Sequence, residues 1–350
     1  MMENQNQPHK RRVRYKGTHP RSFHEKYKEH NPEKYADTIE KVIKKGSTPA
    51  GMHISICVKE ILDFLQIKPG QKGLDATLGY GGHTKEMLKC LDGKGHVYGL
   101  DVDAIEIEKT TKRLRDQGFG EDILTVIQTN FANIDEVAKS HGPFDFMLAD
   151  LGVSSMQIDN PERGFSYKTD GPLDLRLNPT AGTSAAERLQ ELTEDELKWM
   201  LVENSDEPYA DRIAKTVMRE LRVAKKIDTT TRLRELIEES LSFLPEKERK
   251  EAVKKSCQRT FQALRIDVNS EFEVLYAFLD KLPDALAPGG RVAILTFHSG
   301  EDRLVKKSFK QLKKQGVYAE ICEEVIRPSA AECAMNPRAK STKMRWAVKA

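Results

Sequence analysis

From about residue 55 onward, the hydrophobic positions alternate between helical spacing and short continuous runs. Residues 56–65, ICVKEILDFL, carry apolar side chains at helical spacing. Four short apolar runs follow, each typical of a buried strand, at 73–79, 95–103, 123–131 and 144–152. Strands that are apolar on both faces and separated by helices indicate a parallel sheet covered by helices on both sides.

This alternation stops after the fourth strand. Residues 156–258 are rich in charge and in helix formers, and no convincing strand occurs among them. A helix is expected again at 272–286, then a turn and strand at 288–298, and two extended segments at 317–326 and 343–350. One α/β sheet interrupted by an all-helical insertion explains this order better than two independent domains.

The charge is unevenly distributed along the 350 residues. The net charge is only +3, yet residues 1–50 hold 12 basic and 6 acidic side chains, which leaves 45 basic and 48 acidic groups for the rest. A basic arm on a nearly neutral body suits contact with a polyanion, and a solvated, partly disordered tail explains the charge equally well. We therefore expect a basic extension over 1–50, a sheet domain over 51–155 and 259–350, and a helical insertion over 156–258.

The composition argues against several classes of protein. With 38% hydrophobic residues the chain can form a core, but no apolar run approaches the roughly 20 residues that span a bilayer. The N-terminus lacks the apolar stretch of a secretory signal, so a cytoplasmic protein without a membrane partner is expected. The five cysteines are scattered without metal-ligand spacing, which predicts reduced thiols and no metal site.

A glycine-rich turn follows the first predicted strand in LDATLGYGGHT, residues 74–84. Glycine lets the backbone turn sharply and lets a ligand approach, although a plain tight turn has the same appearance. Asp101 ends the second strand about 20 residues later, where a carboxylate can accept hydrogen bonds from both ribose hydroxyls. Asp103 is the better candidate for a helix N-cap. Loop and acid together indicate an adenosine-containing cofactor, either a nicotinamide or S-adenosylmethionine.

Polar residues also follow the fourth strand, in ADLGVSSMQID at 149–159. Methyl transfer needs mainly in-line placement of nucleophile and methyl group, because the sulfonium already carries an excellent leaving group. For an exocyclic amine, acceptors near the nitrogen also help, and Asp150, Ser154 and Ser155 are the natural suppliers. No cysteine stands here as a nucleophile, which argues against methylation of a pyrimidine carbon. Phe131 could stack on adenine or be an ordinary core aromatic.

Five segments of the chain resemble, in order, the motifs of the ribosomal RNA small subunit methyltransferase H family, and the resemblance runs from about residue 53 to the end. They are DATLGYGGHT, DLGVSSMQIDNPERGFSYKTDGPLDLRLN, RTFQALRIDVNSE, APGGRVAILTFHSGEDRLVK and NPRAKSTKMR. The resemblance implies a class I S-adenosylmethionine methyltransferase fold, Rossmann-like with a mainly parallel seven-stranded sheet, and an inserted all-helical domain. It also implies methylation of N4 of a cytidine in the decoding region of 16S ribosomal RNA, with S-adenosyl-L-methionine as cofactor and the RNA or the small ribosomal subunit as partner. With an RNA substrate, the helical insertion over 156–258 is expected to be the RNA-recognition domain.

The resemblance also assigns roles by position. It implies cofactor contacts at Gly81, Gly82, His83, Asp101, Phe131, Asp150 and Gln157. Asp150, with Ser154 and Ser155, is the candidate for the transfer site. Seven further residues of the matching segments are candidates for contact with the RNA, and a buried polar network that supports the insertion explains them equally well: Arg163, Arg176, Arg259, Gln262, Arg265, His298 and Arg303.

Departures from the family pattern leave the target less certain than the chemistry. Gly300 stands where the family usually has leucine, Leu175 and Leu177 replace methionines, and residues 203–215 also differ. Three alternatives therefore stay open: a methyltransferase of this fold acting on another RNA site, a non-catalytic RNA-binding assembly factor, and, least favoured, a nicotinamide oxidoreductase. The intact loop, Asp101 and Asp150 favour an enzyme. The oligomeric state, monomer or homodimer, is left open.

Overall fold

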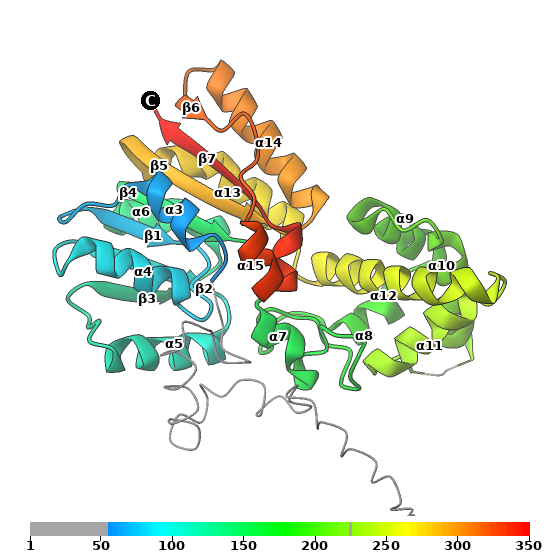
Figure 1. Cartoon of the computed structure of the whole chain (residues 1–350). Coiled ribbons are helices and arrows are strands. Elements are labelled where there is room, and N and C mark those ends of the chain that lie inside the picture. The colour runs from blue at the N-terminus through cyan, green and yellow to red at the C-terminus, as the bar shows by residue number, and fades with distance from the viewer. Residues whose placement is uncertain (1–54, 224–225) are drawn as a thin grey trace, which may run out of the picture. The chain divides into compact units, whose positions relative to one another are not determined.

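The computed structural model describes residues 55–223 and 226–350, so the basic extension expected over 1–50 lies outside the described residues. Seven strands form one sheet in the order β3-β2-β1-β4-β5-β7-β6 (Figure 1). The strands are β1 (Lys72–Asp75), β2 (His96–Asp101), β3 (Leu124–Gln128), β4 (Phe144–Asp150), β5 (Leu286–Thr296), β6 (Tyr318–Ile321) and β7 (Lys343–Lys349). The first five are parallel, and β7 runs antiparallel to β5 and β6. The Rossmann-like, mainly parallel seven-stranded sheet is thereby confirmed.

Helices cover both faces of the sheet, as the apolar strands predict. One core packs α3 (Val58–Leu65), α4 (Gly82–Leu91) and α5 (Ala104–Asp116) against the sheet through residues such as Ile61, Met87 and Leu114. The other core packs α6 (Ile134–His141), α13 (Glu271–Ala285) and α14 (Ser299–Lys314), through residues such as Val137, Phe278 and Phe309. The carboxyl ends of the parallel strands therefore all open toward one edge, where a ligand site is expected.

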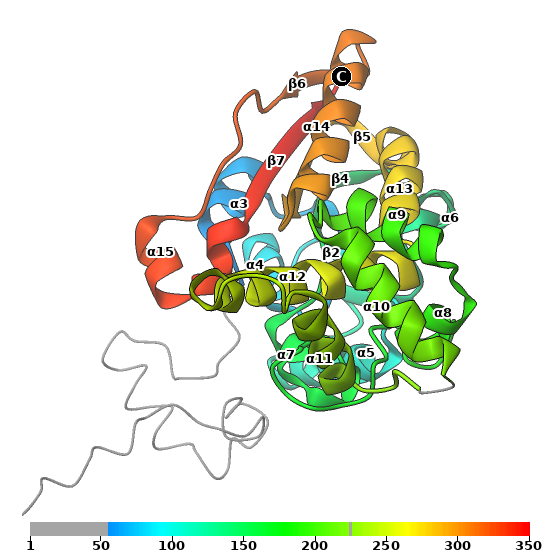
Figure 2. The ribbon, with the colours of Figure 1, turned by 90° about the vertical axis from the view of Figure 1, so that its right-hand side faces the viewer.

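The predicted insertion is helical and has a hydrophobic core of its own (Figure 2). It contains α7 (Ser155–Asp159), η3 (Pro161–Arg163), α8 (Ala185–Glu191), α9 (Glu194–Ser205), α10 (Ala210–Arg222), α11 (Thr230–Ser240) and α12 (Glu246–Val268). Among its described residues, extended pairing is limited to one isolated bridge between Pro172 and Thr229. Helix α12 crosses residue 258, where we expected the insertion to end, because Cys257, Phe261 and Leu264 all belong to the same buried core.

Two short helical elements precede the last strand, β7, namely α15 (Ala330–Met335) and η4 (Pro337–Ser341). Arg338 in η4 donates from both terminal nitrogens to the carboxylate of Asp159 in α7, at 3.0 and 2.8 Å. This pair fastens the C-terminal NPRAK segment to the first helix of the insertion. Within the described ranges, no helix is both long and apolar enough to cross a lipid bilayer.

Candidate cofactor and methyl-transfer site

Two buried hydrogen bonds tie the end of β1 to its surroundings. Asp75 is 1% exposed and accepts a hydrogen bond from the hydroxyl of Thr84 at 2.6 Å. The Thr77 hydroxyl in turn accepts from the backbone N–H of Asp150 at 2.7 Å. The glycine-rich loop is therefore held at its base to α4 and to the end of β4, the strand whose exit carries the predicted transfer site.

The glycines of the loop serve packing as well as turning. Gly79 and Gly81 have φ angles of +48° and +76°, which L-residues rarely adopt. A Cβ on Gly81 would lie 2.7 Å from Thr110 Cγ2, and one on Gly82 would lie 2.0 Å from Ser55 Oγ. The side of Gly79 is more open, with Thr77 O at 3.8 Å. Gly81 and Gly82 are thus required by close protein packing, which the sequence argument about ligand approach did not predict.

Asp101 stands at the end of β2 and binds the glycine loop directly. Its Oδ2 accepts from the N–H of Gly79 at 2.8 Å and its Oδ1 from the N–H of Asp103 at 2.9 Å. Burial raises the pKa of Asp101 to about 6. Since a carboxylate oxygen can accept two hydrogen bonds, one lone pair on each oxygen is still available for ribose hydroxyls. Asp103 caps α5, as predicted, by accepting from the N–H groups of Ile105 and Glu106.

Asp150 ends β4 with one carboxylate oxygen lacking a protein partner. Its Oδ1 is buried without a hydrogen bond, and its Oδ2 lies 3.5 Å from Nδ1 of His83. The other ring nitrogen of His83 lies 2.9 Å from the carbonyl oxygen of Ile56, which can only accept, so Nε2 carries the proton. Burial raises the pKa of Asp150 to about 6, against the lowering effect of His83. The carboxyl of Asp150, which lies beside the imidazole of His83, can therefore bind a proton as the pH falls through about 6.

The residues after β4 build a short helix start. The Ser154 hydroxyl accepts from the N–H of Gln157 at 3.1 Å, and Gln157 Oε1 accepts from the N–H of Ser154 at 2.9 Å. This capping box fixes α7. Gln157 Nε2 also lies 3.4 Å from Asp103, and the carbonyl oxygen of Ser155 accepts from Arg338 at 3.3 Å. Ser154 and Gln157 are thus engaged with the backbone of this loop, beside the end of β4.

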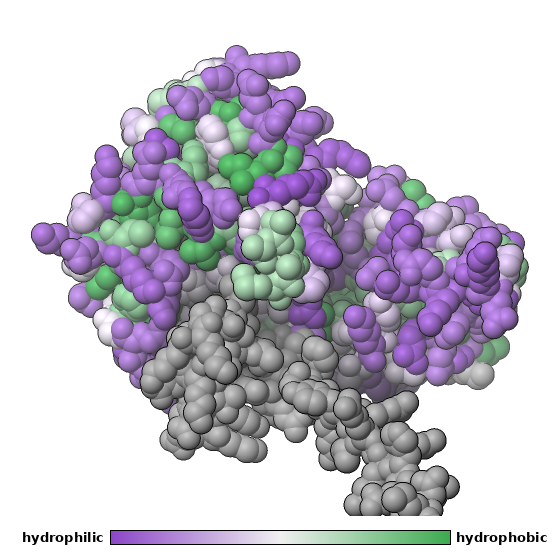
Figure 3. Space-filling model, in the orientation of Figure 1, coloured by the Kyte–Doolittle hydropathy of each residue, from purple (hydrophilic) through white to green (hydrophobic). Residues whose placement is uncertain are grey.

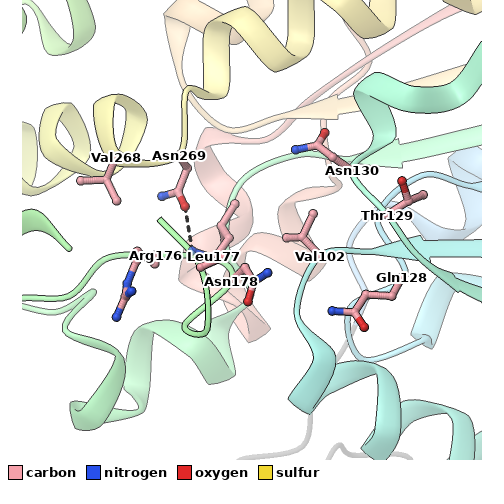
Figure 4. Close-up of a pocket in the computed structure, with 10 residues that line it drawn as sticks. Val102, Gln128, Thr129, Asn130, Arg176, Leu177, Asn178, Val268 and Asn269 are labelled. Atoms are coloured by element: carbon pink, nitrogen blue, oxygen red, sulfur yellow. Dashed lines mark hydrogen bonds between the residues drawn. The ribbon is translucent and has the colours of Figure 1, made fainter. Parts of the chain in front are cut away.

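A cavity of about 380 Å³ opens beyond the ends of β2 and β3 (Figure 4). Its sheet side is lined by Val102 and residues 128–130, and its opposite side by Leu177, Asn178 and Asn269 from the insertion and α12. The Asn269 side chain accepts from the N–H of Leu177 at 2.7 Å. Phe131 follows the lining residue Asn130 and packs edge-on against Phe278, with the ring centroids 5.2 Å apart. The stacking of Phe131 on adenine stays a prediction, and its ring also packs against the hydrophobic core.

Arg163 and Arg176 are engaged within the protein. Arg163 is 8% exposed and donates to the fully buried Asp103 at 2.7 Å and to the carbonyl oxygens of Arg176 and Leu177 at 3.0 and 2.8 Å. Arg176 forms a bidentate ion pair with Asp174, at 2.9 and 2.7 Å, and also lines the cavity. For Arg163 these contacts favour support of the insertion over contact with RNA.

Arg265 and His298 are both connected to Glu271, in a largely buried cluster of charged residues. Arg265 donates to both carboxylate oxygens of Glu271, at 2.7 and 2.9 Å, and one of its nitrogens reaches within 4.0 Å of the Cβ position of Gly152. His298 caps α14 together with Glu301. The side-chain atoms of Glu271, His298 and Glu301 that could bind a metal ion lie within 4.8 Å of one another. The positive charge beside these carboxylates is already supplied by the guanidinium of Arg265, which bonds Glu271.

The remaining RNA candidates lie apart from this cluster. Gln262 donates to the carbonyl oxygen of Asn204 at 3.2 Å, so its amide joins two helices of the insertion. Arg259 is half-buried on α12, and Arg303 is exposed on the first turn of α14. Neither forms a hydrogen bond or ion pair with the described residues, so both are available to a ligand.

Sequence reasoning missed three supporting residues, Asp75, Thr77 and Asn269. Asp75 and Thr77 lie inside the loop motif DATLGYGGHT. The signal that could have identified them is a polar residue at the end of an otherwise apolar strand. Asn269 gave no such signal, because its bonds to Leu177 and to the carbonyl oxygen of Leu175 join residues more than 90 positions apart.

Comparison with known proteins gives a consistent result. A model of the MraW methylase family matches residues 50–350. The chain is 72% identical to "Ribosomal RNA small subunit methyltransferase H 1" of Lachnoclostridium phytofermentans, over 99% of this chain and 95% of that protein. It is 62% identical to "Ribosomal RNA small subunit methyltransferase H 2" of Alkaliphilus metalliredigens, with both chains covered completely.

A third relative is shorter than this chain. "Ribosomal RNA small subunit methyltransferase H" of Clostridioides difficile is 37% identical over 85% of this chain and 98% of its own length. The shorter relative is thus matched almost completely while 15% of this chain is left over, and the family model begins only at residue 50. Residues 1–49 thus lie outside the family model, while the two relatives named above match the chain over 99% and 100% of its length.

Proposed function

Because this chain belongs to the MraW methylase family, we propose that it transfers a methyl group from S-adenosylmethionine to N4 of a cytidine in 16S ribosomal RNA. The ribosomal RNA methyltransferase names of its relatives support the reaction class and the RNA substrate. The single observation that carries the choice of an amine as acceptor is the buried, unpartnered Oδ1 of Asp150 at the end of β4.

The residues present fit the cofactor. The spare lone pairs of Asp101 suit the two ribose hydroxyls, and the cavity beside Val102 and Asn130 suits an adenine. When bound, S-adenosylmethionine supplies a methyl group on a sulfonium that leaves as a neutral thioether. We assign Asp101 to the ribose, residues 128–131 to the base, and the loop of Gly79, Gly81 and Gly82 to the backbone surface between them.

In the proposed reaction, Asp150 orients the amine of the cytidine. Its Oδ1 accepts a hydrogen bond from the N4 amine, which draws the nitrogen lone pair out of conjugation with the ring and toward the methyl group. With the cofactor bound, the N4–CH₃ bond would form as the S–CH₃ bond breaks, and the amine nitrogen would then release one proton. Asp150, paired with His83, takes that proton and passes it to solvent. Ser154 and Gln157 hold the loop that carries these groups.

The deciding experiment is methyl transfer from labelled S-adenosylmethionine to small ribosomal subunits that lack the modification, followed by nucleoside analysis. We expect the label in N4-methylcytidine, at one position in the decoding region. Label in another nucleoside would overturn the assignment of the acceptor, and label at another position would favour a redirected RNA target. If neither cofactor binding nor methyl transfer is detected, the result would favour a non-catalytic RNA-binding factor.

A further inference from the structure

Helix α14 carries a row of basic side chains on the face that points away from the core. Arg303, Lys307, Lys310 and Lys314 are all exposed and occupy positions i, i+4, i+7 and i+11, which lie on one face of a helix. At 1.5 Å per residue, this row is about 16 Å long. The opposite face contributes Val305 and Phe309 to the core below the sheet. We call these four cations the α14 stripe.

The acids of α14 do not neutralise the stripe. The helix has two, Glu301 and Asp302, and both are buried at its first turn. Asp302 pairs with Arg345 at 2.6 Å and with Lys343 at 3.0 Å, while Glu301 caps the helix with His298. The outward face of the helix is therefore cationic along its whole length.

No member of the stripe forms a hydrogen bond or an ion pair with the residues that the structure describes. Exposed lysines on other helices do, as Lys198 and Lys215 do with Asp211, at 3.0 and 2.8 Å. Three glutamates, residues 320, 323 and 324, line a hollow beside Lys310 and Lys313. They flank one side of the stripe, and none reaches ion-pair distance of Lys310.

The stripe begins at the proposed transfer site. Asp150 at the end of β4 pairs in register with Leu295 near the end of β5, and α14 begins three residues after β5 ends, with His298 as its N-cap. Figures 1 and 2 show α14 starting beside the end of α12 and running away from it, and in Figure 3 hydrophilic and hydrophobic residues are mixed over the upper part of the molecule, where α14 lies. Arg303 thus stands nearest the site, and the three lysines follow at increasing distance.

We propose that the α14 stripe binds the phosphate backbone of the RNA strand next to the target cytidine, an inference that rests on the proposed function. Four unpaired cations in a row attract a polyanion through release of its counterions, without reading its sequence. The stripe gives a role to Arg303 and to the outer face of α14, which the chemistry of methyl transfer does not use. It would hold the strand on the sheet domain, on the side of the site away from the insertion cavity.

The test compares two triple variants with the same loss of charge. One changes Lys307, Lys310 and Lys314 to Gln, and the control changes Lys68, Lys94 and Lys112, which are exposed elsewhere on the sheet domain, to Gln. Binding to unmodified 16S RNA transcribed in vitro is measured over a range of salt concentrations. For the stripe variant we expect the slope of log K against log salt to fall by about 2, from about 0.7 per lost phosphate contact. The control should keep the wild-type slope more closely.

A second readout separates this proposal from the proposed function. With the small subunit as substrate, the stripe variant should show a raised KM for the subunit and an unchanged kcat and cofactor affinity. Equal slopes and equal KM for the two variants would overturn the stripe. A stripe variant that binds free RNA normally and loses only subunit binding would also overturn it, in favour of a protein contact. If the wild type forms no N4-methylcytidine but the slopes differ, the proposed function fails and the RNA surface stands.

Discussion

At the residue scale, the pair of His83 and Asp150 makes a prediction about pH. Burial, with smaller contributions from the charges of Asp75 and Glu301, raises the pKa of Asp150 to about 6, against the lowering effect of His83. A protonated Asp150 cannot accept the amine proton, so the rate of transfer at saturating cofactor should fall as the pH drops through about 6. His83→Gln can still donate to Ile56 but removes the lowering charge, so the midpoint should move to higher pH. His141→Gln, on a ring stacked against Tyr98, is the control and should leave the midpoint unchanged.

Asp101 is the second residue whose role can be tested alone. Its carboxylate serves both the loop and, in our proposal, the ribose, so Asp101→Ala should weaken cofactor binding by about 1–3 kcal/mol, the cost of stranding buried polar partners. Asp101→Asn keeps one acceptor oxygen for the N–H of Gly79 and should lose less. Calorimetric titration gives both affinities, and circular dichroism checks the fold. Wild-type affinity in the Ala variant would reject the ribose role.

At the scale of elements, the order of helices and strands could be predicted from the sequence, because continuous apolar runs and helical spacing are local signals. The prediction was less accurate where a strand gives way to a loop. β1 ends at Asp75, four residues before the apolar run does. Ala76 and Leu78 still donate to the carbonyl oxygens of Leu148 and Leu100 in the neighbouring strands, but the backbone then turns at Gly79, whose N–H Asp101 binds. The pairing of Arg163 with Asp103 joins residues 60 positions apart, and no local pattern indicates which buried carboxylate an arginine will meet.

That pair makes a prediction about how the insertion is held to the sheet. Asp103 is fully buried, so Arg163→Gln leaves an unpaired buried carboxylate and should lower the free energy of unfolding by about 3–5 kcal/mol. Combining it with Asp103→Asn should restore part of the loss. Arg115→Gln, whose partner Glu121 is exposed, should cost less than about 1 kcal/mol. Denaturant unfolding gives the free energy of unfolding of these three variants and of the wild type. A loss of RNA affinity by Arg163→Gln at unchanged stability would instead make this arginine a substrate contact.

At the scale of the whole molecule, the sum of charges explains why local basic surfaces matter. Residues 51–350 carry more acidic than basic groups, so without residues 1–50 the protein as a whole would repel a polyanion. Attraction to RNA must then come from places where cations gather, namely the arm, with its net charge of +6, and the α14 stripe. The family model begins at residue 50, so the arm lies outside the part of the chain that the model matches.

Deletion of residues 1–45 should therefore weaken binding to 16S RNA and flatten its dependence on salt, while cofactor affinity stays as in the full chain. Each phosphate contact that is lost lowers the slope by about 0.7, so a fall of 2 or more would mean that the arm makes at least about three contacts. A chain of full length with Gln in place of the Lys and Arg of residues 1–45 is the matched control, since it removes charge but not length. If this chain binds like the deletion, charge is what the arm contributes. Binding equal to that of the full chain in both variants, at every salt concentration, would show that the arm is a solvated tail and leave the α14 stripe and the insertion to hold the RNA.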